Sequence, residues 1–168
     1  MEIREAHDHE YDAAGHIAVE GYRDFYRDRF GDYEGRLRDI AARAAAAHVL
    51  VAIDNGEVVG TVTYVSDPRS DFAQHAEPHE ASIRMLSVAP AHKRRGIGKA
   101  LSVACIERAR AEGKRRIVLH ADEIMQASRA LYESLGFRRD PARDFEPDDE
   151  TMLLCYVLEL RGVDTLSM

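Results

Sequence analysis

The chain has 168 residues, of which 45% are hydrophobic and 32% charged, and its formal net charge is −7. This length suits a single domain, residues 1–168, with a core that needs no disulfide or structural metal. No apolar run reaches the roughly 18 residues of a membrane span, and the acidic balance argues against holding nucleic acid by bulk charge. The first ten residues, MEIREAHDHE, lack the layout of a signal peptide, so we expect a cytoplasmic protein that contacts neither membrane nor nucleic acid.

The first third of the chain predicts a strand, two helices and a hairpin. A short strand is expected at 3–6, a helix from 11 to about 28, and a second, alanine-rich helix at 36–47. Two β-branched runs, 48–53 and 58–65, flank an Asn-Gly pair, which favours a tight hairpin turn.

The rest of the chain alternates strands with helices. The polar segment 66–79 holds two prolines and predicts a long loop of the kind that often carries function. We then expect elements in the order strand 80–88, helix 96–112, strand 116–120, helix 125–135, a short strand at 137, an acidic loop at 140–150 and strand 152–160. This order predicts an α+β fold of three-layer type, with a mixed, mostly antiparallel central sheet and helices on both faces.

One segment combines a strand, a basic turn and the start of a helix. The strand ending at Val88 leads into four cations and two glycines, and the glycines at 96 and 98 precede an amphipathic helix. The first N–H groups of a helix have no intrahelical partner, and the helix dipole favours negative charge there. Glycine lets a phosphate approach the backbone closely, so the segment predicts a pyrophosphate site. Its spacing matches neither a dinucleotide-binding fingerprint nor a P-loop, which argues against a nucleotide enzyme that reuses the same turn.

The same segment resembles the acetyl-CoA signature of the GNAT superfamily of N-acetyltransferases. Leu86-Ser-Val-Ala-Pro90 matches the family's L-x-V-x-P strand, and Lys93 to Gly98 matches R/Q-x-x-G-x-G/A, with lysine in the first position. Leu131-Tyr-Glu-Ser-Leu-Gly-Phe137 looks like the family's LYExLGF element. The resemblance covers nearly the whole chain and implies a GNAT fold that takes acetyl-CoA as cosubstrate, without a metal.

The resemblance also assigns residues to the cosubstrate. Backbone groups of Leu86, Ser87 and Val88 are expected to pair with the pantetheine arm, and Tyr132 to approach the CoA sulfur. The pyrophosphate is expected on Arg94, Arg95, Gly96, Ile97, Gly98 and Lys99. Many relatives carry asparagine seven residues before the tyrosine, where this chain has Met125, so that contact is not expected here and Met125 is interpreted as a packing residue.

Direct acetyl transfer requires a neutral amine, a stabilised oxyanion and protonation of the departing thiolate. Backbone N–H groups near Leu86 to Val88 would serve the oxyanion. Tyr132 is the expected acid, although a core aromatic would give the same pattern. The frequent glutamate base of the family falls on Ser82, which leaves Glu80 on the same strand face, His120 at the end of the next strand, or no dedicated base.

The expected acceptor is a primary amine, on a small molecule or on a peptide or protein. Its contacts are expected from the loops 66–79 and 140–150 and from the aromatic residues Tyr22, Phe25, Tyr26 and Phe30. The family resemblance also makes a homodimer possible. A non-catalytic acyl-CoA-binding sensor is the alternative function, since Ser82 replaces the frequent base.

Two further groups of residues have ordinary explanations. Pro78 interrupts any helix that would align His75, Glu77, His79 and Glu80 on a metal, so no metal site is predicted there. Asp122 and Glu123 are interpreted as helix caps. Cys105 and Cys155 lie in apolar runs and predict reduced core residues.

Overall fold

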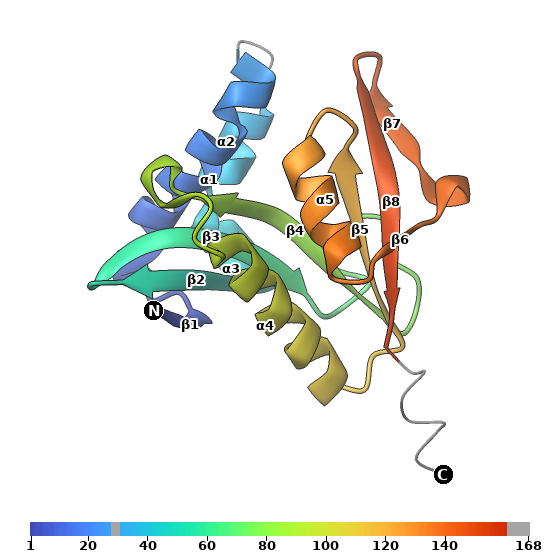
Figure 1. The fold of residues 1–168 in the computed structure, drawn as a ribbon, viewed down its shortest axis with the longest axis horizontal. Coiled ribbons are helices and arrows are strands. Elements are labelled where there is room, and N and C mark those ends of the chain that lie inside the picture. The colour runs from blue at the N-terminus through green and yellow to red at the C-terminus, as the bar shows by residue number, and fades with distance from the viewer. Residues whose placement is uncertain (28–30, 161–168) are drawn as a thin grey trace.

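The computed structural model describes residues 1–27 and 31–160. All strands among these residues belong to one sheet, in the order β1-β2-β3-β4-β5-β8-β6, with β7 beside β8. Neighbouring strands are antiparallel except for β4 and β5, which are parallel (Figure 1). The strands are β1 (Glu2–Glu5), β2 (His48–Asp54), β3 (Glu57–Val65), β4 (Glu80–Val88), β5 (Arg116–Asp122), β6 (Arg138–Arg139), β7 (Phe145–Asp148) and β8 (Thr151–Glu159).

Helices cover both faces of this sheet, and each face has its own core. The α-helices are α1 (Tyr11–Tyr26), α2 (Tyr33–Arg38), α3 (Ile40–Ala46), α4 (Ile97–Ala111) and α5 (Gln126–Ser134). On one face, Ala18 of α1 and Leu37 of α2 pack against Met85 of β4. On the other, Leu101 of α4 and Tyr132 of α5 belong to the largest core cluster. The predicted mixed, mostly antiparallel sheet with helices on both faces is therefore confirmed.

Most predicted elements lie within a few residues of their expected positions. The hairpin turns on Asn55 and Gly56, whose φ angles are 50° and 79°, as a type I′ turn requires. The strand expected at 80–88 is β4 itself. The first helix ends at Tyr26, and position 28 of its predicted range lies outside the described residues.

Two expectations were wrong in detail. The single helix predicted at 36–47 is two helices, because Asp39 leaves the helical region (φ −82°, ψ 74°) and its carboxylate accepts the Ala42 N–H at 3.1 Å as the cap of α3. The acidic segment predicted as a loop contains strand β7, which pairs with β8. Its backbone hydrogen bonds to β8 override a local sequence typical of a turn.

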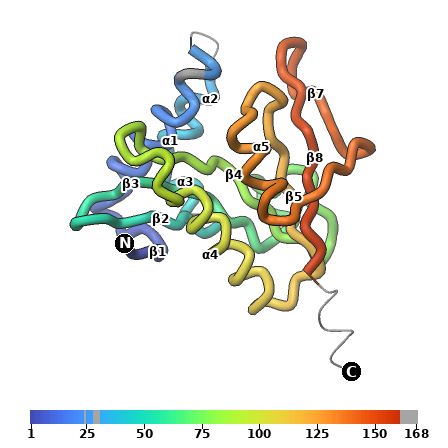
Figure 2. The backbone as a smooth tube through the Cα atoms, in the orientation of Figure 1, coloured from blue at the N-terminus to red at the C-terminus, as the bar shows by residue number. Residues whose placement is uncertain are grey.

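The feature that positions the site is the separation of β4 from β5. The two strands pair only from Glu80↔Arg116 to Ser82↔Val118, and beyond that they diverge (Figure 1). Met85, at φ 56°, marks a bulge in β4, where the pairing with β3 shifts between Thr61 and Thr63. Figure 2 shows the α1–α2 pair and the β7–β8 hairpin extending toward the same end of the molecule as the diverging strands.

Candidate active site

A cavity of about 260 Å³ lies where β4 and β5 separate. Its walls come from α1, α2, the two strands, α5 and the β7–β8 hairpin. Of the predicted catalytic and cosubstrate-binding residues, the cavity brings together His120, Tyr132 and Leu86. Glu80, the rest of the predicted pantetheine strand and the basic turn are not part of its lining.

The β5-facing edge of β4 is available for hydrogen bonding beyond Ser82. Within the described residues, β4 pairs there only with β3, on its other edge, through Gly60↔Val88 and Thr61↔Ser87. The Ser87 side chain points away from this edge and donates to the Ala18 carbonyl at 3.3 Å. An extended ligand can therefore pair with the backbone of 86–88 as an added strand would.

The basic turn ends in an uncapped helix N-terminus. Gly96 has φ 79° and directly precedes α4, and no side chain in the described part of the chain caps the helix. The first intrahelical bond runs from the Ala100 N–H to the Gly96 carbonyl, so the three N–H groups before Ala100 have no partner within the helix. A Cβ on Gly98 would lie no closer than 3.5 Å to its neighbours, so packing does not require glycine there. Arg94, Arg95 and Lys99 are exposed around this end.

Tyr132 lies on α5 at the cavity wall and is 6% exposed. Its ring packs edge-on against Phe137, with 5.7 Å between ring centroids. Burial, with a smaller contribution from Cys105, raises the pKa of Tyr132 above its ordinary value, so the phenol is protonated at neutral pH. Within the part of the chain that is described, its hydroxyl has no hydrogen-bond partner, which leaves it available to a ligand.

His120 lies on β5 and lines the same cavity. Its Nε2 is 3.1 Å from the Arg143 carbonyl oxygen. Because a carbonyl only accepts, Nε2 carries the proton of the neutral ring and Nδ1 is the basic atom. Burial lowers the pKa of His120 and outweighs the hydrogen bond to Arg143; the neighbouring His75 lowers it further. The imidazole is therefore neutral at pH 7 and able to accept a proton.

Glu80 occupies a different environment at the paired end of the two strands. Its side chain is fully buried and accepts hydrogen bonds from Arg116 Nε at 3.0 Å and from Arg143 Nη1 and Nη2 at 2.9 and 2.8 Å. Burial alone would raise the pKa of Glu80, but the hydrogen bonds from Arg143, the Glu77 N–H and Arg116 outweigh it and lower the pKa. A carboxylate held this way outside the cavity is a poor base, so its position does not support the predicted alternative role.

The comparisons with known proteins agree with this geometry. Residues 12–137 match the acetyltransferase (GNAT) family. The chain belongs to the GNAT acetyltransferase family. The L-amino acid N-acyltransferase MnaT of Escherichia coli K12 is 31% identical over 113 residues, which are 67% of this chain and 63% of MnaT. The chain thus matches less than two thirds of that relative's own length.

Solved structures of the GNAT family share the fold over almost the whole chain. Salmonella typhimurium yncA, solved with its cofactor acetyl-CoA, gives a TM-score of 0.69 at 27% identity and covers 95% of this chain and 94% of its own. The ribosomal-protein-alanine N-acetyltransferase of Brucella melitensis gives a TM-score of 0.71 at 24% identity, covering 95% of this chain and 100% of its own. That second likeness concerns the fold alone.

The predicted acceptor contacts lie partly in this GNAT cavity. Tyr22 and Tyr26 line it, whereas Phe25 does not, and position 30 lies outside the described residues. The loops contribute Gln74 from 66–79 and Pro147, Asp148 and Glu150 from 140–150. Met125 is buried in the cavity wall, as a packing residue would be.

The sequence prediction missed three charged residues of the cavity, Arg36, Arg84 and Asp122. Asp122 and Glu123 were interpreted as helix caps, but the N-cap of α5 is Met125 and no side chain of the described residues caps it. Asp122 Oδ1 instead accepts the Ile124 N–H in the preceding turn, at 3.2 Å. Its Oδ2 also accepts the Tyr26 hydroxyl at 3.0 Å, which ties the end of β5 to α1. The usable signal was alternation, because Arg84, two residues after Ser82, and Asp122, two residues after His120, share a strand face with them.

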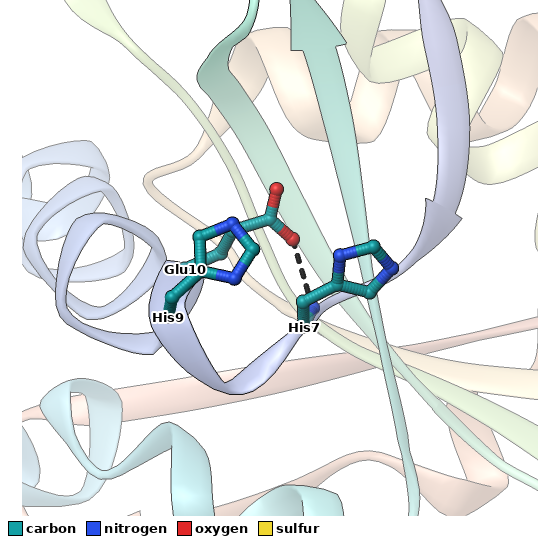
Figure 3. Close-up of side chains that lie close together, drawn as sticks. All are labelled: His7, His9 and Glu10. Atoms are coloured by element: carbon teal, nitrogen blue, oxygen red, sulfur yellow. Dashed lines mark hydrogen bonds between the residues drawn. The ribbon is translucent and has the colours of Figure 1, made fainter.

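Ionisable residues away from the cavity have structural explanations. In the described chain, the side chains of His7, His9 and Glu10 come close enough to share a metal ion (Figure 3). However, Glu10 accepts the His7 N–H and two Arg4 donors, each at 2.8 Å, so its carboxylate caps the first turn and neutralises Arg4. These bonds, led by that from Arg4, lower the pKa of Glu10 to about 2 despite its burial.

The remaining expectations concern the cysteines and the membrane. Cys105 and Cys155 are both buried and free, as predicted. None of the helices in the described ranges is long and apolar enough to cross a bilayer.

Proposed function

We propose that this chain is an N-acetyltransferase that moves the acetyl group of acetyl-CoA directly to a primary amine within a ternary complex. One observation carries the proposal: an unpaired strand edge at 86–88, an uncapped helix N-terminus at Gly96 and a cavity containing His120 and Tyr132 lie along one opening between β4 and β5. These are the three surfaces that a phosphorylated thioester and its acceptor need.

The cosubstrate is proposed to bind along that opening. Backbone groups of Leu86, Ser87 and Val88 would pair with the pantetheine arm, and the pyrophosphate would take the free N–H groups of Ile97, Gly98 and Lys99. Gly96 allows the close approach, and the remaining cations of the turn, Arg94 and Arg95, add charge from solvent. This arrangement places the thioester at the cavity and the phosphates outside it.

His120 is proposed to remove the proton that the amine loses on attack. The amine nitrogen forms a bond to the thioester carbon, and Nδ1 of His120 takes a proton from that nitrogen, directly or through water. Backbone N–H groups at 86–88 would stabilise the oxyanion. The carbon–sulfur bond then breaks, and the thiolate leaves.

Tyr132 is proposed to protonate that thiolate. The phenol's raised pKa does not disqualify it, because the same surroundings raise thiol values too: burial raises the pKa of the neighbouring Cys105 to about 12. The same surroundings disfavour a thiolate released beside Tyr132, which favours its protonation by the phenol, and solvent later restores the phenolic proton.

The experiment has a binding step and a turnover step. Thermal shift with acetyl-CoA, CoA, ATP and NAD is expected to show saturable stabilisation by the two CoA species alone, by a few kcal/mol at many times the dissociation constant. Thiol release is then followed with a panel of primary amines, and the product is identified by mass. Stabilisation without any turnover would indicate the acyl-CoA sensor instead, and no stabilisation would refute the proposed function.

A further inference from the structure

Arg84 is a half-buried cation on the cavity wall, and no carboxylate of the described chain pairs with it. Its only hydrogen bond among the described residues runs from Nη1 to the Phe72 carbonyl at 3.3 Å. A guanidinium has five donors in a planar fork that matches a carboxylate. Most of the donors of Arg84 therefore remain available at a surface that lines the cavity.

Three other partly buried arginines of the chain are neutralised by carboxylates. Arg116, Arg139 and Arg143 hold carboxylates at 3.0, 2.7 and 2.8 Å. The chain has 30 acidic residues against 23 basic ones, so acids are plentiful. An arginine left without an acid on a cavity wall is thus placed to meet an anion that arrives from solution.

The surroundings of Arg84 add positive charge instead of removing it. Arg36 lines the same cavity from α2, and no acid partner of it is found in the described chain. Within residues 1–27 and 31–160, Arg43, 1% exposed, donates only to the Thr63 hydroxyl and to the carbonyls of Arg36 and Leu37, and its Nη2 has no partner. Burial lowers the pKa of Arg43 to about 10, and the charge of the nearby Arg84 contributes to this shift.

The bulge in β4 explains why Arg84 lies in this place. Arg84 pairs with Thr63 and Ser87 with Thr61, so two residues of β4 oppose one of β3. A bulge re-aims the side chains beside it, and here Arg84 and Met85 both line the cavity.

Strand β5 supplies negative charge to the cavity. Asp122 is 5% exposed, lines the cavity from β5 and has no cationic partner within the described residues. Its two known bonds, from Tyr26 and Ile124, leave acceptor capacity on a carboxylate that offers about four lone-pair sites. Asp148 and Glu150 line the cavity from the β7–β8 hairpin. His120, the proposed base, belongs to the same strand as Asp122.

From this polarity we infer the class of the acceptor, an inference that rests on the proposed function. We propose that the acceptor is a small amino acid, whose carboxylate binds Arg84 with support from Arg36 and whose amine lies on the Asp122 side beside His120. The tyrosines of α1 and α2 would pack against its side chain. The cavity, at about 260 Å³, falls slightly below the range of about 300–1,000 Å³ usual for small-molecule sites, which favours a compact acceptor.

The test compares acceptors that differ only in the carboxylate. The best amino acid from a panel is measured against its amide and its decarboxylated amine, at saturating acetyl-CoA. We expect kcat/KM for the amino acid to exceed both by about 100-fold, mainly through KM, because removing a bidentate ion pair costs a factor of this order. Equal or better turnover of the amide or amine would overturn the inference while leaving N-acetyl transfer intact.

A substitution at Arg84 tests whether this residue causes the preference for an acceptor with a carboxylate. Arg84→Gln is expected to lower kcat/KM for the amino acid by about 100-fold and to change that for the decarboxylated amine by less than 3-fold. Arg69→Gln, at an exposed arginine outside the cavity lining, is the matched control and should change neither. If Arg84→Gln keeps the acetyl-CoA thermal shift but loses kcat/KM equally for both acceptors, the assignment is overturned. If Arg84→Gln does not fold, Arg84→Lys must lose the preference for the amino acid over the decarboxylated amine. Absence of turnover with every amine despite acetyl-CoA binding would instead refute the proposed function.

Discussion

The two ends of the β4–β5 pair differ in whether their polar side chains already have partners. At the paired end, Glu80 is enclosed by Arg116 and Arg143, and every charge has a partner within hydrogen-bonding distance. At the separated end, His120 and Tyr132 line a cavity, and each keeps a polar atom without a partner in the described chain. Both ends belong to the same sheet, but β4 and β5 pair only at the end that holds Glu80.

This difference indicates how the strands divide their roles. A buried carboxylate satisfied by four hydrogen bonds is committed to holding the strands together, and its lowered pKa makes it a weak base. The neutral imidazole and the protonated phenol at the other end are able to exchange protons with a ligand. Substitutions at the paired end should therefore change stability, and substitutions at the separated end should change catalysis.

The largest effect is expected from Tyr132→Phe. Removing the hydroxyl takes away the proposed acid but keeps the ring that packs against Phe137. We expect kcat to fall by about 10²–10³-fold, within the range for general acid catalysis, with acetyl-CoA affinity and thermal stability nearly unchanged. Steady-state thiol release and calorimetry check this. A variant that loses less than about threefold in kcat would remove Tyr132 from the mechanism.

His120→Gln is expected to lower kcat by about 10²-fold. Glutamine can still donate to the Arg143 carbonyl but offers no base. In the wild type, the pKa of His120 lies below its ordinary value of 6.5, so the base is lost, and kcat falls, only below that pH. The variant should lack this acidic limb in its pH–kcat profile. His75→Gln, at the exposed neighbouring ring, is the control and should keep the limb.

Glu80→Gln is expected to act on stability instead of chemistry. It leaves two partly buried arginines without their shared acid, which should cost about 3 kcal/mol in the free energy of unfolding at pH 7, with kcat kept within a few-fold. Because the folded pKa of Glu80 is lowered, this stabilisation exists above about pH 4.5 and is lost as the pH falls through the folded value.

Denaturant unfolding at pH 7 and below pH 4 measures the difference in the free energy of unfolding between wild type and Glu80→Gln. This difference should be smaller below pH 4 than at pH 7. Glu77→Gln, whose side chain is 58% exposed and only 3.8 Å from Arg116, serves as the matched control and should lose less than about 1 kcal/mol. If the difference in the free energy of unfolding is the same below pH 4, Glu80 stabilises the fold through packing and not through charge.

The smallest effect concerns the phosphate turn. Gly98→Ala adds a methyl group where the fold has room, so stability should stay level or rise by up to about 1 kcal/mol. The methyl group would stand where the pyrophosphate is proposed to approach, and we expect the Kd for acetyl-CoA to rise about tenfold. Titration calorimetry gives both the affinity and, with a melting scan, the stability. An unchanged Kd would place the phosphates elsewhere.

The sequence predicted the local features of this molecule well. The Asn55-Gly56 turn, the β4 strand and the turn before α4 each depend on a few neighbouring residues, and all three were found where expected. The break at Asp39 was missed because a single capping carboxylate outweighed the helix-forming alanines around it. Strand β7 was missed because it depends on pairing with β8.

The site was predicted less completely, because its side chains depend on partners that are distant in the sequence. Glu80 looked like a possible base because its partner Arg143 is 63 residues away along the chain. Arg84 and Asp122 could be recognised as site residues only in the structure, where the bulge in β4 and the divergence of β4 from β5 place both on one cavity. Motifs reveal where the backbone binds a ligand, whereas long-range pairing decides which side chains remain free to react.

The most direct test of the account is hydrogen–deuterium exchange with and without saturating acetyl-CoA. The separated end should become protected, with slower exchange at the backbone amides of 86–88 and 96–99, while the paired end around Glu80 and Arg116 should not change. Protection confined to these segments would support cosubstrate binding between β4 and β5. Unchanged exchange there at saturating acetyl-CoA, or protection only at the paired end, would contradict it.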